Sequence, residues 1–274
     1  MSEMEIDGYK KWVCVTPVRQ EENCHAIQYA QRLAKFFDAK WVTRDSRSIA
    51  KIFSDTGAEV IVVAADWPVF YHRDQTENGL QYHPGMSTLR LQTLLQGGTD
   101  RLLQAAQIRP SDWVLDATCG LASDAVVLSY AVGRQGKVTA LEKSPVIYRM
   151  LQHAQTEGLE HLPQQISTWL SRIDLLHQDA LQFLRQSSHQ QYDVIYIDPM
   201  FQEPIMNSPG IAALRPFAYK EPLDEILFAE ACRVTRQRVV IKARAHDSIW
   251  RRLPIQPDKL SGRVRYGIWE REGT

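Results

Sequence analysis

The residues of this chain best suited to chemistry are acids that directly follow apolar segments. The clearest is Asp198, which follows the apolar run 194–197 and precedes Pro199 and, two residues later, Phe201. The exocyclic amine of a nucleobase has two protons, for which Asp198 and a backbone carbonyl near Pro199 would be acceptors. Phe201 would stack on an extruded base, and catalysis would come mainly from positioning. The structural alternative is that Pro199 only ends a strand and that Phe201 packs in the core.

A second group surrounds Asp116, which also follows an apolar segment. Gly120 permits a tight turn here, and a helix beginning at Ser123 and Asp124 would offer its N-terminus to a carboxylate. Asp116 itself would accept a hydrogen bond from an amino group. One glycine in a strand-to-helix turn is also ordinary turn geometry, so this group alone does not establish a ligand site.

Two further acids follow the next two apolar segments. Glu142 is suited to accept hydrogen bonds from both ribose hydroxyls of a nucleoside cofactor, and its spacing from Asp116 fits one strand-helix-strand step. The alternative for Glu142 is a solvent-facing acid at a helix start. Asp179, which precedes Ala180, would contact an adenine amino group or cap the following helix, and one residue can do both.

The alternation of strands and helices after residue 112 would bring these acids together. Strands are predicted at 113–117, 137–141, 173–176, 192–197, 238–243 and 264–269, with helices at 123–132, 146–157, 180–186 and 223–234. This order predicts a doubly wound, mostly parallel, Rossmann-like α/β sheet. Because no strong helix separates its last two strands, it also predicts an antiparallel last strand at a hairpin-like edge. Ligands of such sheets bind beyond the carboxyl ends of the strands, where all these acids lie.

The first 80 residues predict a separate, small N-terminal α/β unit. Strands at 12–15, 40–43 and 59–64 alternate with helices at 21–37 and 49–53. A loop at 82–86 leads to a helical segment, 86–106, which is interrupted by the glycine pair at 97–98, a candidate boundary or hinge. We therefore predict two domains, residues 1–80 and residues 81–274.

The composition of the chain is that of an ordinary globular protein. It has 32 basic and 32 acidic residues and 44% hydrophobic residues, which excludes disordered and collagen-like chains. Its apolar runs are far shorter than the roughly 20 residues that span a bilayer, and its start is polar and acidic. We expect a cytoplasmic protein with no membrane association and no signal peptide. The four cysteines and eight histidines lack metal-ligand spacing, so no metal is predicted.

Several short motifs together resemble one known family. They are DATCGLASD at 116–124, LEKSP at 141–145, DPMF at 198–201, RVVIK at 238–242 and RYGIW at 265–269, with HPGM at 83–86 and Arg90 upstream. In these motifs the chain resembles the bacterial small-subunit ribosomal RNA guanine-N2 methyltransferases of the RsmJ type. DPMF is the most specific, because it resembles the Asp-Pro-Pro-Tyr/Phe motif of amino-group methyltransferases. The predicted sheet is also the topology of class I S-adenosylmethionine-dependent methyltransferases.

The resemblance implies a reaction, a cofactor and a partner. It implies transfer of a methyl group from S-adenosylmethionine to the N2 amine of a guanine, with ribosomal RNA or the small ribosomal subunit as the partner. Carried over position by position, it implies cofactor contacts at Ser123, Asp124, Glu142, Lys143, Asp179, Ala180 and Asp198. It does not imply an oligomeric state.

Three other functions are compatible with the sequence. The net charge of zero is compatible with methylation of another nucleic acid or of a small molecule. A nicotinamide-dependent dehydrogenase also has an acid after its second strand, but no Gly-x-Gly-x-x-Gly follows Asp116. A non-catalytic RNA- or ribosome-binding protein could keep the same fold, but it would not need an amine-orienting carboxylate such as Asp198.

Basic residues are concentrated at the C-terminal end of the chain. From Arg233 onward there are 11 basic residues against four acidic ones. We predict an RNA-contact surface there, formed by Arg244, Arg251, Arg252, Arg263 and Arg265 with Trp250 and Tyr266 among them. The alternative is an ordinary solvated surface.

Overall fold

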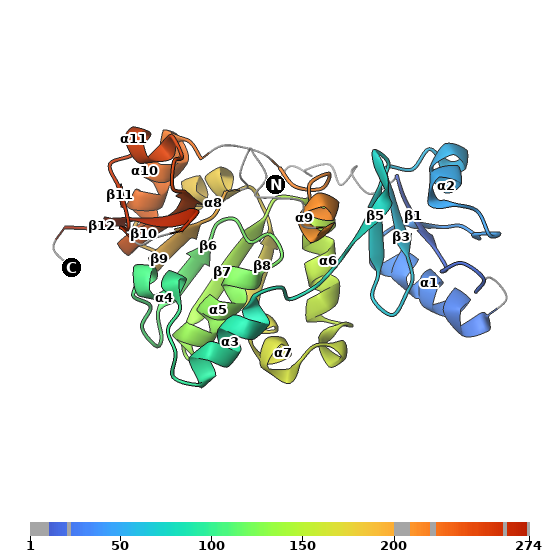
Figure 1. Cartoon of the computed structure of the whole chain (residues 1–274), viewed down its shortest axis with the longest axis horizontal. Helices are drawn as coiled ribbons and strands as arrows, with labels where there is room; N and C mark the ends of the chain where they lie inside the picture. Colours follow the sequence, from blue (N-terminus) through green and yellow to red (C-terminus); the bar gives the residue numbers. More distant parts are fainter. Residues whose placement is uncertain (1–10, 21–22, 200–208, 220–222, 260–261, 273–274) are drawn as a thin grey trace. The chain divides into compact units, whose positions relative to one another are not determined.

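The computed structural model in Figure 1 describes residues 11–20, 23–199, 209–219, 223–259 and 262–272. The chain divides into two compact units, Met1–Tyr82 with Ile205–Ala218 and His83–Pro204 with Tyr219–Thr274. The division after Tyr82 lies two residues beyond the expected one, and the sequence pattern gives no sign that Ile205–Ala218 groups with the first unit. Among the described helices, none combines the length and the apolar character that a bilayer crossing requires.

The first unit contains a five-stranded sheet in the order β2-β1-β3-β4-β5. β1 (Trp12–Val15) pairs in parallel with β2 (Lys40–Trp41) and β3 (Val60–Val63). β4 (Val69–His72) and β5 (Gln75–Gln81) extend this sheet in antiparallel fashion. The sequence pattern does not predict these last two strands, because β5 reads QTENGLQ and lacks a regular apolar alternation.

Two helices of the first unit cover opposite faces of this sheet. α2 (Ile49–Thr56) packs Ile52 and Phe53 in a common core with Val13 and Val15 of β1. Cys14 faces the other way, because side chains alternate along a strand, and its Sγ donates to a carbonyl of α1 (Cys24–Phe36), the Ala30 oxygen, at 3.2 Å. α9 (Pro209–Leu214) also belongs to this unit and contacts β5.

The second unit is built on a seven-stranded sheet in the order β11-β12-β10-β9-β6-β7-β8. Its strands are β6 (Trp113–Asp116), β7 (Lys137–Glu142), β8 (Ile173–His177), β9 (Tyr192–Ile197), β10 (Thr235–Arg244), β11 (Gln256–Pro257) and β12 (Val264–Glu270). The strands from β6 to β10 pair in parallel, whereas β12 runs antiparallel to β10, with Val240 opposite Ile268. This confirms the predicted doubly wound α/β fold with an antiparallel last strand.

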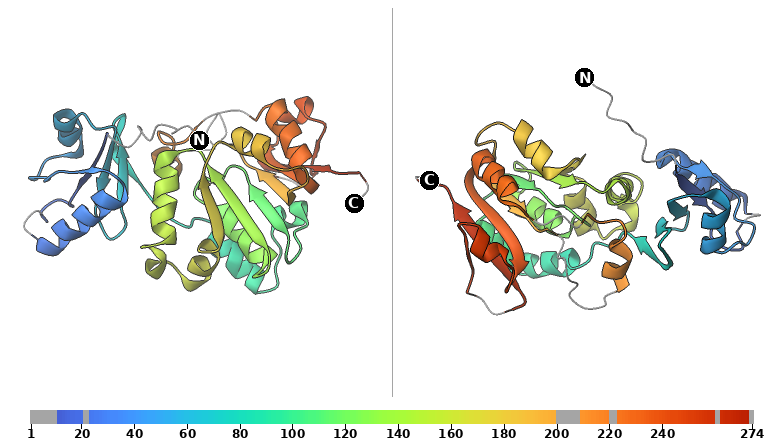
Figure 2. Two further views of the ribbon diagram at one scale, coloured as in Figure 1. Left: turned by 180° about the vertical axis from the view of Figure 1, so that it is seen from behind. Right: turned by 90° about the horizontal axis from the view of Figure 1, so that it is seen from above.

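Helices cover both faces of this sheet, as Figures 1 and 2 show. α8 (Ala180–Gln186) and α10 (Glu225–Val234) pack on one face, where Leu184 and Phe228 share a buried core with Leu115, Ile195 and Ile241. α4 (Arg101–Ala106) and α5 (Ser123–Val132) contact the sheet from the other face. The remaining helices are α3 (Ser87–Leu95), α6 (Pro145–Gln155), the 3-10 helix η1 (Leu159–His161), α7 (Gln164–Leu170) and α11 (Ile249–Arg252).

The predicted element order is right in one detail and wrong in two. The helical segment 86–106 is interrupted at the glycine pair, as expected, and forms two helices, α3 and α4, because Gly97 takes a left-handed backbone with φ 80° and Asp100 caps the start of α4. The glycine pair is therefore a turn within the second unit and not a domain boundary. In addition, α11 and β11 lie between the last two predicted strands, and β11 pairs with β12, so β12 is not at the edge of the sheet.

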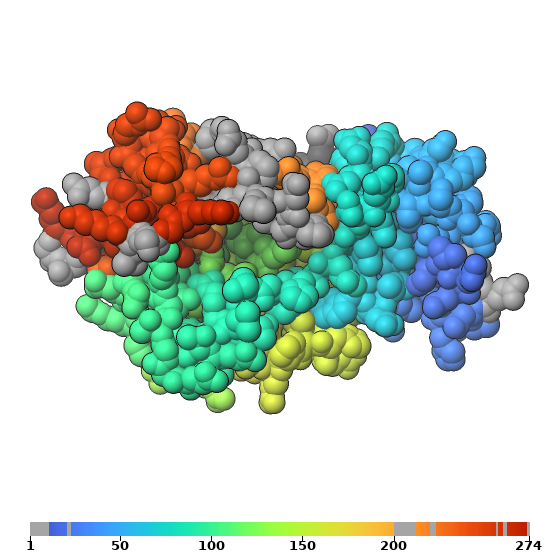
Figure 3. All heavy atoms as spheres, in the orientation of Figure 1, coloured from blue at the N-terminus to red at the C-terminus, as the bar shows by residue number. Residues whose placement is uncertain are grey.

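The strand order reverses between β6 and β9, so the carboxyl ends of these two strands and of β7 lie next to one another. Ligands of open α/β sheets bind at such a switch point, since the loops and helices that follow the strands diverge there. Figure 3 shows that one face of the second unit is hollowed, where green residues recede between the teal residues of α3 and the red residues of the last strands.

Candidate active site

Three predicted acids lie at the carboxyl ends of adjacent strands. Asp116 is the last residue of β6, Glu142 is the last residue of β7, and Asp198 directly follows β9. Asp116 is 1% exposed, and its Oδ1 accepts a hydrogen bond from the amide of Thr118 at 3.1 Å. Within the described residues its Oδ2 is buried and has no hydrogen-bond partner. Burial raises the pKa of this carboxyl group well above its ordinary value, and the neighbouring acids add to the effect.

The turn between β6 and α5 is shaped by Gly120. Its φ of 54° is left-handed, and a Cβ built there would meet no heavy atom within 4 Å, so the space beside the turn is open. The Gly120 amide donates to Glu142 Oε2 at 2.9 Å, and the Ser144 amide donates to Oε1 at 2.7 Å. Burial nevertheless raises the pKa of Glu142 to about 7, since these hydrogen bonds only partly offset desolvation.

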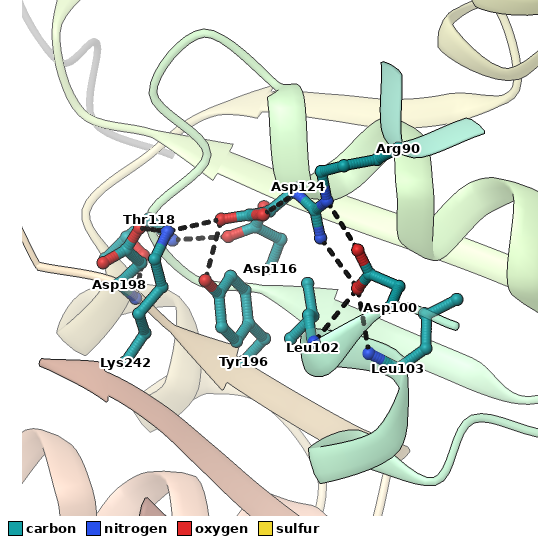
Figure 4. A network of polar contacts seen from close by, with 10 residues as sticks. All are labelled: Arg90, Asp100, Leu102, Leu103, Asp116, Thr118, Asp124, Tyr196, Asp198 and Lys242. Atoms are coloured by element: carbon teal, nitrogen blue, oxygen red, sulfur yellow. Dashed lines mark hydrogen bonds and ion pairs between the residues drawn. The ribbon is translucent and has the colours of Figure 1, made fainter. Parts of the chain in front are cut away.

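Asp124, in the first turn of α5, is the centre of a polar network that Figure 4 shows. Its Oδ1 is paired with Arg90 Nη1, and its Oδ2 accepts from the Tyr196 hydroxyl at 2.8 Å and from Lys242 Nζ at 3.1 Å. Burial opposes ionisation of Asp124, but the charges of Lys242 and Arg90 outweigh it and hold the pKa at about 2. Ser123 begins the same helix, whose N-cap, Ala122, makes no side-chain hydrogen bond.

Asp198 is held from two sides. Its amide donates to Thr118 Oγ1 at 2.6 Å, and its Oδ2 accepts from Lys242 Nζ at 2.6 Å. Its Oδ1 is buried and has no hydrogen-bond partner among the described residues. Burial raises the pKa of Asp198 to about 6, against the lowering effect of Lys242. Pro199 follows and is partly buried, whereas Phe201 lies outside the described residues, so its stacking role stays a prediction.

Three further residues complete this network, and their contacts with the acids were not predicted from the sequence. Arg90 of α3 binds Asp100 with two nitrogens, at 2.7 and 3.0 Å, and Asp100 in turn caps α4. Lys242 extends from β10, and Tyr196 from β9, where it is fully buried. The signal that could have found Lys242 is its position, because a lysine two residues before the end of a buried strand beside β9 faces the same edge as Asp198.

A second polar group lies after β7 and β8. Lys143 Nζ is 3.0 Å from Asp179 Oδ2 and also lies over the ring of Tyr219, 4.9 Å from its centroid. Asp179 Oδ1 accepts from the Gln182 amide at 3.0 Å, so Asp179 is the N-cap of α8, and Ala180 is the first residue of that helix. The predicted capping role of Asp179 is therefore confirmed. Asp179 also pairs with Lys143, and both residues lie at the carboxyl edge of the sheet.

The basic C-terminal segment does not form one free charged surface. Most of its cations bind carbonyl or carboxylate groups of the second unit, namely Arg233, Arg236, Arg238, Lys242, Arg252, Arg265 and Arg271. Tyr266 is buried, and Trp250 donates from Nε1 to the Arg244 carbonyl at 2.6 Å, so Tyr266 is not the surface aromatic that we expected. Arg238 is buried and the Lys242 side chain is mostly buried, so these two cations add little to a surface charge, whereas Arg251, Arg252 and Arg263 of the predicted surface are exposed.

Comparison with known proteins decides the family. The sequence model of the family described as "Putative SAM-dependent methyltransferase" matches residues 79–267, which is well over half of the chain. The chain belongs to this family of S-adenosylmethionine-dependent methyltransferases. Its cofactor is therefore S-adenosylmethionine, and the dehydrogenase alternative is excluded.

Individual relatives of this methyltransferase cover most of its length. YpiP of Bacillus subtilis is 33% identical over 223 residues, 80% of this chain and 84% of that protein. A protein of Pseudomonas syringae pv. tomato named ribosomal RNA small subunit methyltransferase J is 28% identical over 227 residues, 80% of this chain and 76% of its own. The solved structure of a SAM-dependent methyltransferase from Neisseria gonorrhoeae matches with a TM-score of 0.59, covering 96% of this chain and 97% of that one. At 16% identity that likeness shows the shared fold.

The chemistry of the three strand-end acids fits the cofactor of this methyltransferase. S-adenosylmethionine carries two ribose hydroxyls, an ammonium group and a sulfonium cation. Glu142 is a buried acceptor whose position is fixed by two backbone amides, and Asp116 has a buried oxygen without a partner among the described residues. The open space beside Gly120 adds room next to both acids. A nucleoside that carries ribose hydroxyls and an ammonium group therefore offers donors that match the acceptors at this edge.

We expect the affinity of this methyltransferase for S-adenosylmethionine to be about tenfold weaker at pH 6 than at pH 8. A group with a pKa of about 7 loses its negative charge across this range, and a protonated Glu142 is a poorer acceptor for ribose hydroxyls. Calorimetric titration at several pH values measures this. Glu142→Gln is the control, because it keeps any pH dependence of the cofactor's own amino group. Equal pH dependence of the two proteins would contradict the prediction.

Proposed function

We propose that this methyltransferase transfers the methyl group of S-adenosylmethionine to the N2 amine of a guanine in small-subunit ribosomal RNA. The observation that carries the proposal is the buried Oδ1 of Asp198, which lies at the switch point of the sheet and has no partner among the described residues. An exocyclic amine offers the proton that this oxygen can accept, and the backbone near Pro199 is the acceptor for the second proton. The names of relatives such as the Pseudomonas syringae protein support ribosomal RNA as the substrate.

The bound cofactor would supply a methyl group on a positively charged sulfur, which makes the methyl carbon reactive toward a nitrogen lone pair. Asp198 would orient the amine so that its lone pair points at that carbon. As the new carbon–nitrogen bond forms, the bond between the methyl carbon and sulfur would break, and its electron pair would stay on sulfur, which leaves as a neutral thioether. The nitrogen becomes cationic and releases one of its protons. Asp198, whose pKa is about 6, can take this proton and pass it to solvent.

The remaining candidate residues would hold the cofactor. Glu142 would accept from the ribose hydroxyls, and Asp116 would bind the ammonium group. Lys143 with Asp179 and Ala180 would border the adenine. The N-terminus of α5, at Ser123 and Asp124, would receive the carboxylate through backbone amides, because the side chain of Asp124 is already occupied by Arg90, Tyr196 and Lys242.

The proposal is tested by methyl transfer from S-adenosylmethionine carrying a tritiated methyl group. The acceptors are unmodified small-subunit ribosomal RNA made in vitro, small subunits reconstituted with that RNA, large-subunit RNA, transfer RNA, duplex DNA and free guanosine. We expect label in the small-subunit RNA or the reconstituted subunit, recovered as N2-methylguanosine after digestion to nucleosides. Label in a different nucleoside, in DNA or in free guanosine alone would contradict the proposal. With a ribosomal substrate, the enzyme would act in the cytoplasm.

A further inference from the structure

Lys242 lies between two carboxylates of the candidate site, those of Asp198 and Asp124. Its Nζ is 2.6 Å from Asp198 Oδ2 and 3.1 Å from Asp124 Oδ2, and Figure 4 shows the ammonium group between these side chains. The side chain is 22% exposed, so most of it is removed from water. Among the described residues, Lys242 is the cation that contacts Asp198 directly. One oxygen of Asp198 is therefore occupied, while the other has no partner within the part of the chain that the structure describes.

The titratable groups that face Asp198 come from six elements. Lys242 of β10 and Arg90 of α3 are positive, whereas Asp124 of α5 and Asp116 of β6 are negative. The hydroxyls of Tyr196 on β9 and Tyr266 on β12 complete the surroundings. Without Lys242, Asp198 would be a buried carboxylate close to two other acids. Among the described cations, the more distant Arg90 would then oppose their repulsion. Such a carboxylate takes up a proton and loses its function as an acceptor.

The position of Lys242 is itself fixed. Asp124 binds the ammonium group from the side opposite Asp198, and Asp124 is held in turn by Arg90 and by the Tyr196 hydroxyl. A lysine side chain is flexible and its three N–H donors could turn toward either oxygen of Asp198. With Asp124 as a second anchor, the ammonium group stays on the Oδ2 side, and Oδ1 keeps its place for another donor.

We propose that Lys242 is the positioning residue for the acceptor carboxylate: it holds Oδ2 of Asp198, keeps that group ionised and reserves Oδ1 for the amine of the target base. This inference rests on the proposed function, since it assigns Asp198 to the target amine. Lys242 touches neither the base nor the methyl group in this account. It acts through Asp198, so its loss changes the charge state of another residue and leaves the reacting atoms in place.

The test compares Lys242→Met and Lys242→Arg with the unmodified enzyme, using kcat for RNA methylation between pH 5.5 and 9.5. In the unmodified enzyme we expect kcat to fall below a pH near 6, as Asp198 takes up a proton. In Lys242→Met this fall moves up by about one pH unit or more, so kcat drops about twofold or more at pH 7 and recovers toward the unmodified value at pH 9. Lys242→Arg keeps the original profile within about half a unit.

Lys137→Met is the matched control. Lys137 begins β7 and pairs with Asp174 at 3.2 Å, and both side chains are about half exposed, so its loss removes a lysine–aspartate pair far along the strand from the site. The pH profile of kcat in Lys137→Met should be the same as in the unmodified enzyme. An unchanged profile in Lys242→Met, or a loss of activity that no pH restores, would overturn the proposal, because a purely structural or directly catalytic lysine gives those results.

A second measurement does not depend on the substrate. Carbon-13 NMR of protein labelled at the aspartate carboxyl groups, with Asp198→Asn used to assign the signal, follows the titration of Asp198 directly. The Asp198 signal should titrate near pH 6 in the unmodified protein and about one unit or more higher in Lys242→Met. If RNA methylation is absent but this shift is present, the proposed function fails while the pairing of Lys242 with Asp198 holds. If the shift is absent, the inference about Lys242 fails whatever the substrate.

Discussion

Replacing Asp198 by asparagine should lower methyl transfer by about a thousandfold while the affinity for S-adenosylmethionine stays within about threefold. Oδ1 of Asp198, which has no partner among the residues described, is the acceptor proposed for the target amine, and an amide at this position is a weaker acceptor that carries no charge. The substitution also removes the ion pair with Lys242, whose Nζ is 2.6 Å from Oδ2. Initial rates with labelled cofactor and calorimetric titration measure the two quantities on one preparation.

Asp174→Asn is the matched control for this substitution. Asp174 lies in β8 of the same sheet and pairs with Lys137 at 3.2 Å, but both side chains are about half exposed. The Asp174→Asn protein therefore loses a carboxylate and an ion pair, but nothing changes at the carboxyl edge of the sheet. Its methylation rate should equal that of the unmodified enzyme. Full activity of Asp198→Asn would remove Asp198 from the proposed mechanism. A loss of cofactor affinity as large as the loss of rate would assign it to cofactor binding.

The sheet of the second unit and the three strand-end acids could be predicted from the sequence for one physical reason. A buried parallel strand is a short apolar run, so the residue at which the run ends is visible in the sequence. Parallel strands present all their carboxyl ends at one edge of the sheet. Asp116, Glu142 and Asp198 each end such a run, and the structure places them on adjacent strands.

The contacts around Asp124 could not be predicted in the same way. Lys242 and Asp124 are separated by 118 residues, and Tyr196 and Asp124 by 72. Their contacts depend on strand order and on which face of α5 the carboxylate points to, and a local pattern of residue types contains neither. The role expected for Asp124 as a cofactor contact rested on its place at a helix start. The structure adds that its carboxylate is already satisfied by protein donors.

The hydrogen bonds of Glu142 also lie beyond the sequence pattern. A carboxylate at the end of β7 is visible as an acid after an apolar run, but its partners are the backbone amides of Gly120 and Ser144. Backbone donors have no sequence signature, since every residue except proline has one. The sequence could therefore identify the acid as a candidate and could not show that the turn after β6 fixes its orientation.

Replacing Arg90 by methionine should lower the free energy of unfolding of the second unit by about 3 kcal/mol. Arg90 binds Asp100 at 2.7 Å and pairs with Asp124, and the side chains of the three residues are 19%, 9% and 14% exposed. Removing the guanidinium group leaves Asp100 without this charge partner and Asp124 with Lys242 and the Tyr196 hydroxyl. Hydrogen exchange of peptides from β6 and β9, followed in increasing urea, reports on this unit separately from the first.

The expected cost comes from the carboxylates left behind and not from the lost pairs themselves, so two further variants test the cause. Lys137→Met removes a half-exposed pair and should cost less than about 1 kcal/mol. Adding Asp100→Asn to Arg90→Met should restore part of the loss, because asparagine removes the buried charge and can still accept from the amides of Leu102 and Leu103 at the start of α4. If the double variant is less stable than Arg90→Met alone, the unpaired charge of Asp100 is not the source of the loss, and packing of the Arg90 side chain is.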